Sequence, residues 1–228
     1  MVTKKNKQIK SKERVAKHGE VFTNEREVKA MCDLVNNETE RIDSRFLEPA
    51  CGDGNFLAEI LTRKLNIVKQ RYRRSHLDYE KNSLLAISSL YGVDILLDNV
   101  LACRERLYKI WEKQYKSICK DDCNDDTKES IKFILSKNIV CGNALTLCMV
   151  DEKGNDVPEP IVFSEWGFVT GPQIARSEYT FAEILEENDN DSTLKNKKNK
   201  KTLLGENNGE GKFIKRTVMN YRRLQDYE

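Results

Sequence analysis

A glycine-rich turn around residue 52 is the strongest chemical feature of the sequence. Residues 45–50 are short and apolar, as a buried strand would be, and they run through Gly52-Asp53-Gly54 into an apolar helical pattern that begins at Asn55. Glycines allow the backbone to turn sharply and approach a ligand, and the free N–H groups of the following helix can bind it. The acid between the glycines disfavours a pyrophosphate and suits a positive group, such as the ammonium of an amino acid.

The spacing of this turn differs from two common nucleotide-binding motifs. Leu57 stands where the dinucleotide pattern G-x-G-x-x-G has its third glycine, and no Gly-Lys-Ser/Thr follows as in a phosphate-binding loop. A tight strand–helix turn without any ligand remains an alternative from these residues alone.

Two later strand ends carry polar side chains that can meet at this turn. Asp94 lies at the end of a predicted strand, 89–95, and a carboxylate there can accept hydrogen bonds from both hydroxyls of a ribose. Asn143 lies near the end of a third predicted strand, 137–145. In an open α/β sheet, cofactors bind in the crevice beyond the carboxyl ends of the strands. The alternatives are a loop acid or helix cap for Asp94 and an ordinary turn residue for Asn143.

The elements that position these residues alternate between helix and strand, which predicts an α/β fold with a parallel, Rossmann-like sheet wound with helices. The sheet is expected to be incomplete for want of chain length. One helix is predicted to follow Thr23, which would be its N-cap, and a second to begin at Asn55. A third is predicted to follow Asp98, which would cap it. Loops are predicted at 69–82 and 119–129, and a possible fourth strand at 160–169.

Composition divides the chain into three parts. Residues 1–17 hold seven Lys or Arg against one acid and are predicted to be a disordered basic arm. Residues 18–187 form the predicted α/β domain, and 188–228 a charged, low-complexity tail in which 213–224 can form a short amphipathic helix. The net charge of +2 is too small to indicate a nucleic-acid binder. Basic blocks of this kind are either solvated or in contact with phosphate.

The sequence also indicates where the protein is located and whether its cysteines form disulfides or bind a metal. No run of about 18 apolar residues is present, which argues against a membrane-spanning helix. The basic N-terminus is not followed by the apolar segment of a secretory signal. The seven cysteines include no C-x-x-C pair. We therefore expect a cytoplasmic protein with reduced thiols and no metal site.

Five stretches of the chain, in order, resemble the adenine-specific (N6) DNA methyltransferases of bacterial restriction–modification systems, in both their single-chain and M-subunit forms. The resemblance implies a Rossmann-like fold that binds S-adenosyl-L-methionine (SAM). In the first stretch, Asn24 replaces the proline of the family pattern G-E-x-[FY]-T-P. The stretches are 17–23 (K-H-G-E-V-F-T), 47–57 (L-E-P-A-C-G-D-G-N-F-L), 92–95 (G-V-D-I), 142–145 (G-N-A-L) and 161–166 (I-V-F-S-E-W).

The resemblance also implies a set of cofactor-binding residues. Phe22 and Thr23 would lie against the methionine end of SAM, and Asp94 would hold the ribose. Asn143 replaces the family's Asp, which accepts a hydrogen bond from the adenine amino group, and an uncharged amide accepts it less strongly. The predicted set is Phe22, Thr23, Glu48, Pro49, Ala50, Cys51, Gly52, Asp53, Gly54, Asn55, Phe56, Asp94, Ile95, Asn143 and Ala144.

The catalytic motif of that family, [ND]-P-P-[YF], is absent. In the family the target adenine is flipped out of the duplex, and the motif positions its amine and stacks on its ring. The four prolines of this chain, at 49, 158, 160 and 172, include no Pro-Pro pair. The nearest segment, 168–173 (F-V-T-G-P-Q), has neither the amide nor the aromatic residue at the positions of the motif. No catalytic residue is predicted, and the isolated chain is expected to be inactive.

The favoured hypothesis is a SAM-binding component of an adenine-specific DNA methyltransferase that acts on double-stranded DNA. A second methyltransferase or restriction subunit would complete the sheet and supply catalysis. One alternative is a truncated, inactive remnant that acts, if at all, as a DNA- or partner-binding module. Another is a small-molecule or RNA methyltransferase, which would share the cofactor turn.

Overall fold

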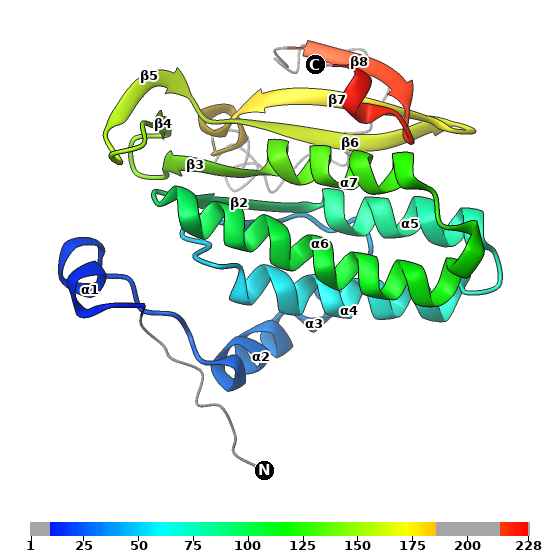
Figure 1. Cartoon of the computed structure of the whole chain (residues 1–228), viewed down its shortest axis with the longest axis horizontal. Helices are drawn as coiled ribbons and strands as arrows, with labels where there is room; N and C mark the ends of the chain where they lie inside the picture. Colours follow the sequence, from blue (N-terminus) through cyan, green and yellow to red (C-terminus); the bar gives the residue numbers. More distant parts are fainter. Residues whose placement is uncertain (1–9, 186–214, 228) are drawn as a thin grey trace, which may run out of the picture.

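Two sheets and a layer of helices make up the part of the chain that the computed structural model describes, residues 10–185 and 215–227 (Figure 1). The larger sheet is mixed, with strand order β1-β2-β3-β4-β5. Its parallel strands are β1 (Phe46–Glu48), β2 (Leu90–Asp94) and β3 (Ile139–Asn143). β4 (Cys148–Val150) and β5 (Asp156–Pro160) add an antiparallel hairpin. The predicted α/β class is therefore confirmed, with a parallel core of three strands.

β2, the middle one of the three parallel strands, is covered on both faces, which explains its apolar sequence as far as Val93. Leu90 and Val93 are fully buried, on opposite faces of the strand. Leu90 belongs to the main core with the helices, whereas Val93 belongs to a smaller cluster with Phe163 and Phe181. Among the described residues, β1 pairs with β2 alone, so its other edge carries no strand there.

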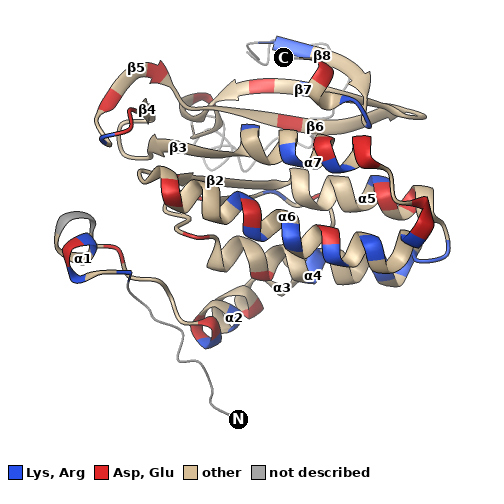
Figure 2. Ribbon diagram, in the orientation of Figure 1, with Lys and Arg blue, Asp and Glu red and all other residues tan. Residues whose placement is uncertain are grey.

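Helices pack against the larger sheet and bury the main core, in which Tyr79, Trp111 and Tyr115 are fully buried. Figure 2 shows basic and acidic segments interspersed along the outer surface of α6, where pairs such as Glu105–Lys109 join successive turns. None of the described helices is both long and apolar enough to span a bilayer. The helices are α1 (Lys12–His18), α2 (Glu25–Leu34), α3 (Asn36–Thr39), α4 (Asn55–Tyr72), α5 (His76–Ser88), α6 (Leu97–Cys119) and α7 (Asp125–Asn138), with short 3-10 turns η1 (Lys120–Asp122) and η2 (Leu224–Asp226).

The second sheet is antiparallel, with order β6-β7-β8, and comprises β6 (Val162–Thr170), β7 (Gln173–Thr180) and β8 (Lys215–Asn220). The segment 160–169, predicted as a fourth strand of the first sheet, belongs here instead. β4 pairs antiparallel with β3 and so occupies the edge of β3 that a fourth parallel strand would have used. The chain after β5 therefore continues outside the first sheet. The prediction of a helix within 213–224 is also wrong for its described part, because β8 pairs with β7 along six residues.

Three predicted irregular segments are in fact helical. All but the last residue of α1 lies within the predicted disordered arm, 1–17. The predicted loop 69–82 contains the end of α4 and half of α5, and 119–129 contains η1 and the start of α7. Ser75 and Asn124 cap α5 and α7 with their side chains, and both helices bury apolar residues at helical spacing. The first nine residues of the arm and 188–214 of the tail lie outside the described residues.

Two predicted helix caps are displaced. Asn24, not Thr23, is the N-cap of α2, and its side chain forms a capping box with Glu27. Asp98 lies inside the first turn of α6 rather than at its cap, and its carboxylate binds Arg14.

Candidate functional site

The glycine turn joins the end of β1 to the start of α4 and is fastened to β2. The Cys51 N–H donates to the Val93 carbonyl at 2.9 Å, and the Gly54 N–H donates to the Cys51 carbonyl at 2.8 Å. Gly52 and Gly54 have φ angles of +52° and +87°, a region that favours glycine. The turn therefore directs the first N–H groups of α4 towards the carboxyl edge of the sheet.

Both glycines are also required by close neighbours. A Cβ atom at Gly54 would lie 2.7 Å from the Cys103 sulfur of α6, and one at Gly52 would lie 2.9 Å from the Phe22 ring. The N-terminal segment and α6 thus both contact the turn. Phe22, which the resemblance would place against the methionine end of SAM, thus lies beside the glycine turn.

At two predicted site residues near the end of β1, the surroundings favour the uncharged form of the side chain. Burial raises the pKa of the Glu48 carboxyl, although the Ala50 N–H opposes this shift. The neighbouring Cys103 thiol and burial raise the pKa of the Cys51 thiol far above its usual range. Cys51 is accordingly a neutral packing residue below the turn, whereas Pro49 and Ala50 are exposed on it.

Asp94 reaches the glycine turn from the tip of β2. Its carboxylate accepts hydrogen bonds from the Gly52 N–H at 2.9 Å, the Leu96 N–H at 2.8 Å and the Asn99 side-chain amide at 3.2 Å. A carboxylate has about four acceptor positions, so about one remains for a ligand. Asp94 therefore couples the turn to the start of α6.

The segment before Phe22 is held over this edge of the sheet by Arg14 of α1. The Arg14 guanidinium binds both oxygens of Glu20, at 2.6 and 2.7 Å, and the Asp98 carboxylate at 2.7 Å. These bonds lower the pKa of Glu20 and of Asp98. Asn99 donates to Glu20 at 2.7 Å as well as to Asp94, so one network joins α1, α6 and the tip of β2.

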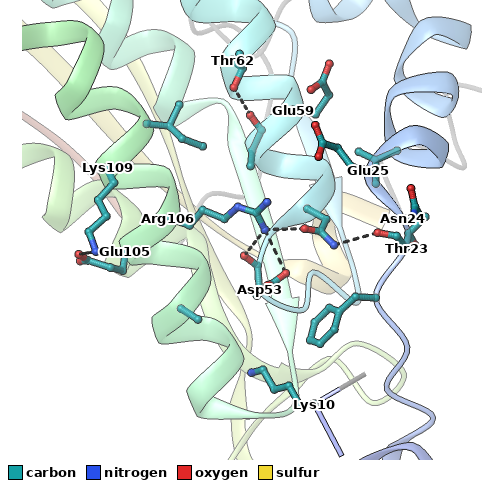
Figure 3. Close-up of a pocket in the computed structure, with 16 residues that line it drawn as sticks. Lys10, Thr23, Asn24, Glu25, Asp53, Glu59, Thr62, Glu105, Arg106 and Lys109 are labelled. Atoms are coloured by element: carbon teal, nitrogen blue, oxygen red, sulfur yellow. Dashed lines mark hydrogen bonds and ion pairs between the residues drawn. The ribbon is translucent and has the colours of Figure 1, made fainter. Parts of the chain in front are cut away.

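A cavity of about 960 Å³ opens beside the turn, between the N-terminal segment, α2, α4 and α6 (Figure 3). Phe22, Thr23, Asp53 and Asn55 line it, and all four belong to the predicted site. The Asn55 side-chain amide donates to the Thr23 carbonyl at 3.1 Å, which fixes the N-terminal segment to the start of α4.

Arg106 of α6 is the main residue of this cavity that the sequence did not predict. Its Nη1 lies 3.3 Å from Asp53 Oδ1 and 2.6 Å from Asn55 Oδ1 (Figure 3). Asp53 is therefore partly neutralised, which modifies the expectation of a purely negative turn. A guanidinium has five N–H donors, and the bonds of Arg106 to described residues use only Nη1. Asp53 and Arg106 together present both signs of charge to the cavity.

The predicted residues on β3 lie apart from this cavity. Asn143 Nδ2 donates to Asp156 Oδ1 at 3.0 Å, and Asn143 Oδ1 accepts from the Leu145 N–H at 3.0 Å. Neither Asn143 nor Ala144 lines the cavity; Ala144 packs against the smaller apolar cluster. Ile95, at the tip of β2, lies near Gly154 in the β4–β5 loop, where a Cβ would be 3.9 Å from Ile95 Cγ1.

The Gly171-Pro172 turn, the segment nearest in sequence to a catalytic motif, lies far from these residues. It joins β6 to β7, and the Gly171 carbonyl accepts a hydrogen bond from Lys81 of α5 at 2.8 Å. α5 leads into the amino end of β2, and Figure 1 shows the β6–β7 turn at the end of the molecule opposite α1. This turn therefore cannot act at the carboxyl edge of the sheet.

No group of three or more His, Cys, Asp or Glu side chains suited to a metal ion occurs in the described ranges 10–185 and 215–227. The chain matches no family model, no curated protein and no solved structure.

Proposed function

We propose that this chain is the SAM-binding component of an adenine-specific DNA methyltransferase. The observation that carries the proposal is the convergence of Phe22 and Thr23, the Gly52–Gly54 turn and Asp94 at one edge of a parallel sheet. These three places are separated by up to 72 positions in the sequence. Hydrogen bonds and close contacts nevertheless join them.

The chemistry of the cavity suits the amino-acid end of SAM, which carries an ammonium and a carboxylate. Asp53 would accept a hydrogen bond from the ammonium, and the unused N–H groups of Arg106 would bind the carboxylate. The Phe22 ring would lie against the positively charged sulfonium, which an aromatic face attracts. Asp94 does not line the cavity; its remaining acceptor position, on the other side of the glycine turn, would hold the ribose.

The group that SAM supplies when bound is a methyl for transfer. The residues of this chain would bind and orient the cofactor, and none of them is assigned to the polarisation of an adenine amine. Catalysis is assigned to a second polypeptide, on double-stranded DNA, because the [ND]-P-P-[YF] motif is absent and the Gly171-Pro172 turn lies at the opposite end of the molecule.

The first experiment measures the melting temperature of the full chain with and without SAM. We expect SAM to raise it for the wild type and to have no effect on Asp94→Ala. Asp94→Asn keeps an acceptor for the Gly52 N–H, so the turn should stay in place. A comparison of this variant with Asp94→Ala therefore shows whether a lost response to SAM comes from the missing carboxylate or from a displaced turn. Asp126→Ala, which removes an exposed carboxylate on α7, is the matched control and should behave as wild type.

A melting temperature of the wild type that does not respond to SAM would contradict the proposal. It would favour the alternative of an inactive remnant that serves as a binding module, for which Asp94→Ala should not change the response to SAM. An undiminished rise in Asp94→Ala would show that the ribose acid has been misassigned.

The second experiment follows tritiated methyl transfer to mixed-sequence duplex DNA. The pure chain should transfer no label, and label should appear when the product of a neighbouring gene with an N-P-P-Y motif is added. Clear incorporation by the pure chain would overturn the assignment of catalysis to a second polypeptide.

A further inference from the structure

Two blocks of opposite charge lie side by side at the end of the molecule opposite α1 (Figure 1). The basic block, residues 69–74 (K-Q-R-Y-R-R), ends α4 and leads towards α5, and it contains four cations and no acid. The acidic block, residues 121–125 (D-D-C-N-D), runs from η1 to the start of α7 and contains three acids and no cation. α4 has 18 residues and is therefore about 27 Å long, so the basic block lies far from the glycine turn.

A contact between His76 and Asp122 holds the two blocks next to each other. His76 is the first residue of α5, and its Nδ1 lies 2.5 Å from Asp122 Oδ2. The Cys119 thiol, at the end of α6, donates to the His76 carbonyl at 4.0 Å. Figure 2 accordingly shows the blue segment between α4 and α5 beside the red segment between α6 and α7. This face therefore presents a positive and a negative region together.

Most of these charges are not used within the fold. In the part of the chain that the structure describes, the four cations of the basic block and Asp121 are exposed and form no ion pair. Other exposed cations are paired, as Lys29 is with Glu25 of the same helix. Leu77, which follows His76, is 51% exposed. An apolar residue bordered by charges is the arrangement of a protein interface, which has an apolar centre and a polar rim.

The closeness of the two blocks indicates which partner they suit. A nucleic acid on the basic block would bring its phosphates close to Asp121 and Asp122, which repel them. A second copy of the chain, related by a twofold axis, meets no such conflict. The basic block of each copy would then face the acidic block of the other, and the two Leu77 side chains would lie near the axis. Charge complementarity therefore favours a second copy.

We propose that this face is a twofold interface between two copies of the chain. The inference does not depend on the proposed function. The cavity and the glycine turn lie at the other end of α4, so both would stay open at the outer ends of the dimer. The contacts are mainly between exposed charges, which salt screens, so the dimer is weak and salt-sensitive.

Sedimentation of the full chain over a range of concentrations is the first test. At about 0.1 M NaCl we expect a reversible equilibrium between one chain and two. The dissociation constant of the dimer should rise at least about tenfold at about 1 M NaCl, because the Debye length falls from about 10 Å to about 3 Å. A single chain at every concentration and salt would overturn the inference.

Charge reversal tests the pairing of the blocks. One variant combines Arg73→Glu with Arg74→Glu, and a second combines Asp121→Lys with Asp125→Lys. Each places like charges opposite each other in its own dimer and should raise the dissociation constant at least about thirtyfold. An equimolar mixture of the two variants should dimerise again, since each reversed block then faces its complement. Recovery in the mixture also shows that both variants are folded.

A matched control changes the net charge equally at another place. Lys215→Glu with Arg216→Glu alters two exposed residues at the far end of β8 from the β6–β7 turn, and it should dimerise as the wild type does. A dimer that survives the reversals in either block, or a mixture that stays monomeric, would overturn the proposed pairing.

Binding of DNA separates the rejected partner from the proposed one. Fluorescence anisotropy with a labelled duplex of about 20 base pairs should show no difference between the wild type and the variant with Arg73→Glu and Arg74→Glu. A monomeric wild type whose binding to the duplex is lost in that variant would assign the basic block to phosphate and overturn the inference. None of these measurements requires SAM, so they leave the proposed function untouched.

Discussion

Charged side chains have opposite surroundings at the two ends of the parallel strands. At the amino end, Lys64 and Glu80 are almost completely buried, and their polar atoms are satisfied by other side chains and by the backbone. At the carboxyl end, Asp53 and Arg106 form an ion pair that lines a cavity. The comparison separates charges that hold the fold together from charges available to a ligand.

Lys64 and its partners fix the starts of β1 and β2. Its ammonium donates to the carbonyls of Ile42, at 3.2 Å, and Ser44, and to the Ser89 hydroxyl at 2.6 Å. All three donors of the ammonium are therefore used. Lys64 is therefore a structural residue and has no capacity for a substrate.

Glu80 of α5 holds the segment that follows β8. One carboxylate oxygen accepts from the Tyr221 hydroxyl at 2.6 Å and from Arg222 Nε at 2.7 Å. The other accepts from the Tyr115 hydroxyl of α6. Burial, together with these bonds, raises the pKa of both tyrosines. The network joins three distant parts of the chain.

Loss of Glu80 should produce the largest change in stability. Glu80→Ala leaves two buried hydroxyls and a guanidinium without their acceptor, and we expect the free energy of unfolding to fall by about 3 kcal/mol or more. Urea denaturation measures it. Glu129→Ala, which removes an exposed i,i+3 partner of Lys132, should cost less than about 0.5 kcal/mol. Equal losses in the two variants would show that the buried network is not a special source of stability.

A side chain on the glycine turn should have the next largest effect. Gly54→Ala combines a left-handed backbone with a clash against Cys103, and we expect a loss of about 2–3 kcal/mol. Gly19→Ala is the control, because Gly19 also has a positive φ (+64°) but no neighbour within 4 Å; its cost should be about 1 kcal/mol.

A double-mutant cycle with Cys103→Ala isolates the contact between the turn and α6. In that background the cost of Gly54→Ala should fall towards that of Gly19→Ala. An unchanged cost would mean that the backbone angle alone, and not the proximity of α6, requires glycine.

The burial of Lys64 should give a pH dependence of stability. Burial lowers the pKa of its ammonium from 10.5 to about 7, so between these pH values the unfolded chain binds one more proton than the folded chain. Stability from this group therefore rises with pH across that window. Relative to Lys64→Met, the wild type should gain about 2 kcal/mol between pH 7 and pH 9. A constant difference between the two proteins over this range would contradict the lowered pKa.

Arg106 should affect ligand binding with little effect on stability. Arg106→Met should weaken SAM binding about tenfold, equivalent to about 1.4 kcal/mol, and should leave the affinity for decarboxylated SAM unchanged. Lys109→Met, which removes a second cationic side chain from the cavity that is already paired with Glu105, should alter neither affinity by more than about twofold. A similar loss of affinity for both ligands in Arg106→Met would argue against a contact between Arg106 and the carboxylate.

The parts of the fold that the sequence predicted are those with strong local patterns. β2 and β3 are apolar runs that end at polar residues, and α4 follows directly from the glycine turn, so these elements were correct to within a few residues. The pattern of 213–224 was ambiguous. Its apolar spacing fits a helix, but pairing with β7 makes it a strand in which Met219 is buried and Val218 is exposed.

The residues of the site that the sequence predicted are likewise those that belong to a local pattern. The turn and Asp94 are identified by spacing and by their position at strand ends. Arg106 lies in the middle of a long helix, and only the packing of α6 beside α4 brings its guanidinium to Asp53. Asp156 reaches Asn143 through the fold of a hairpin. Contacts of this kind depend on tertiary structure, which no local pattern encodes.

The late return of the chain to the core through β8 has a consequence for biosynthesis. Met219, Tyr221 and Leu224 are essentially fully buried against helices that are translated about a hundred residues earlier. A nascent chain that has emerged only as far as residue 185 therefore presents an unfilled apolar surface and a Glu80 that lacks its bonds to Tyr221 and Arg222. On the ribosome, this part of the main core is therefore completed only after residue 224 has been translated.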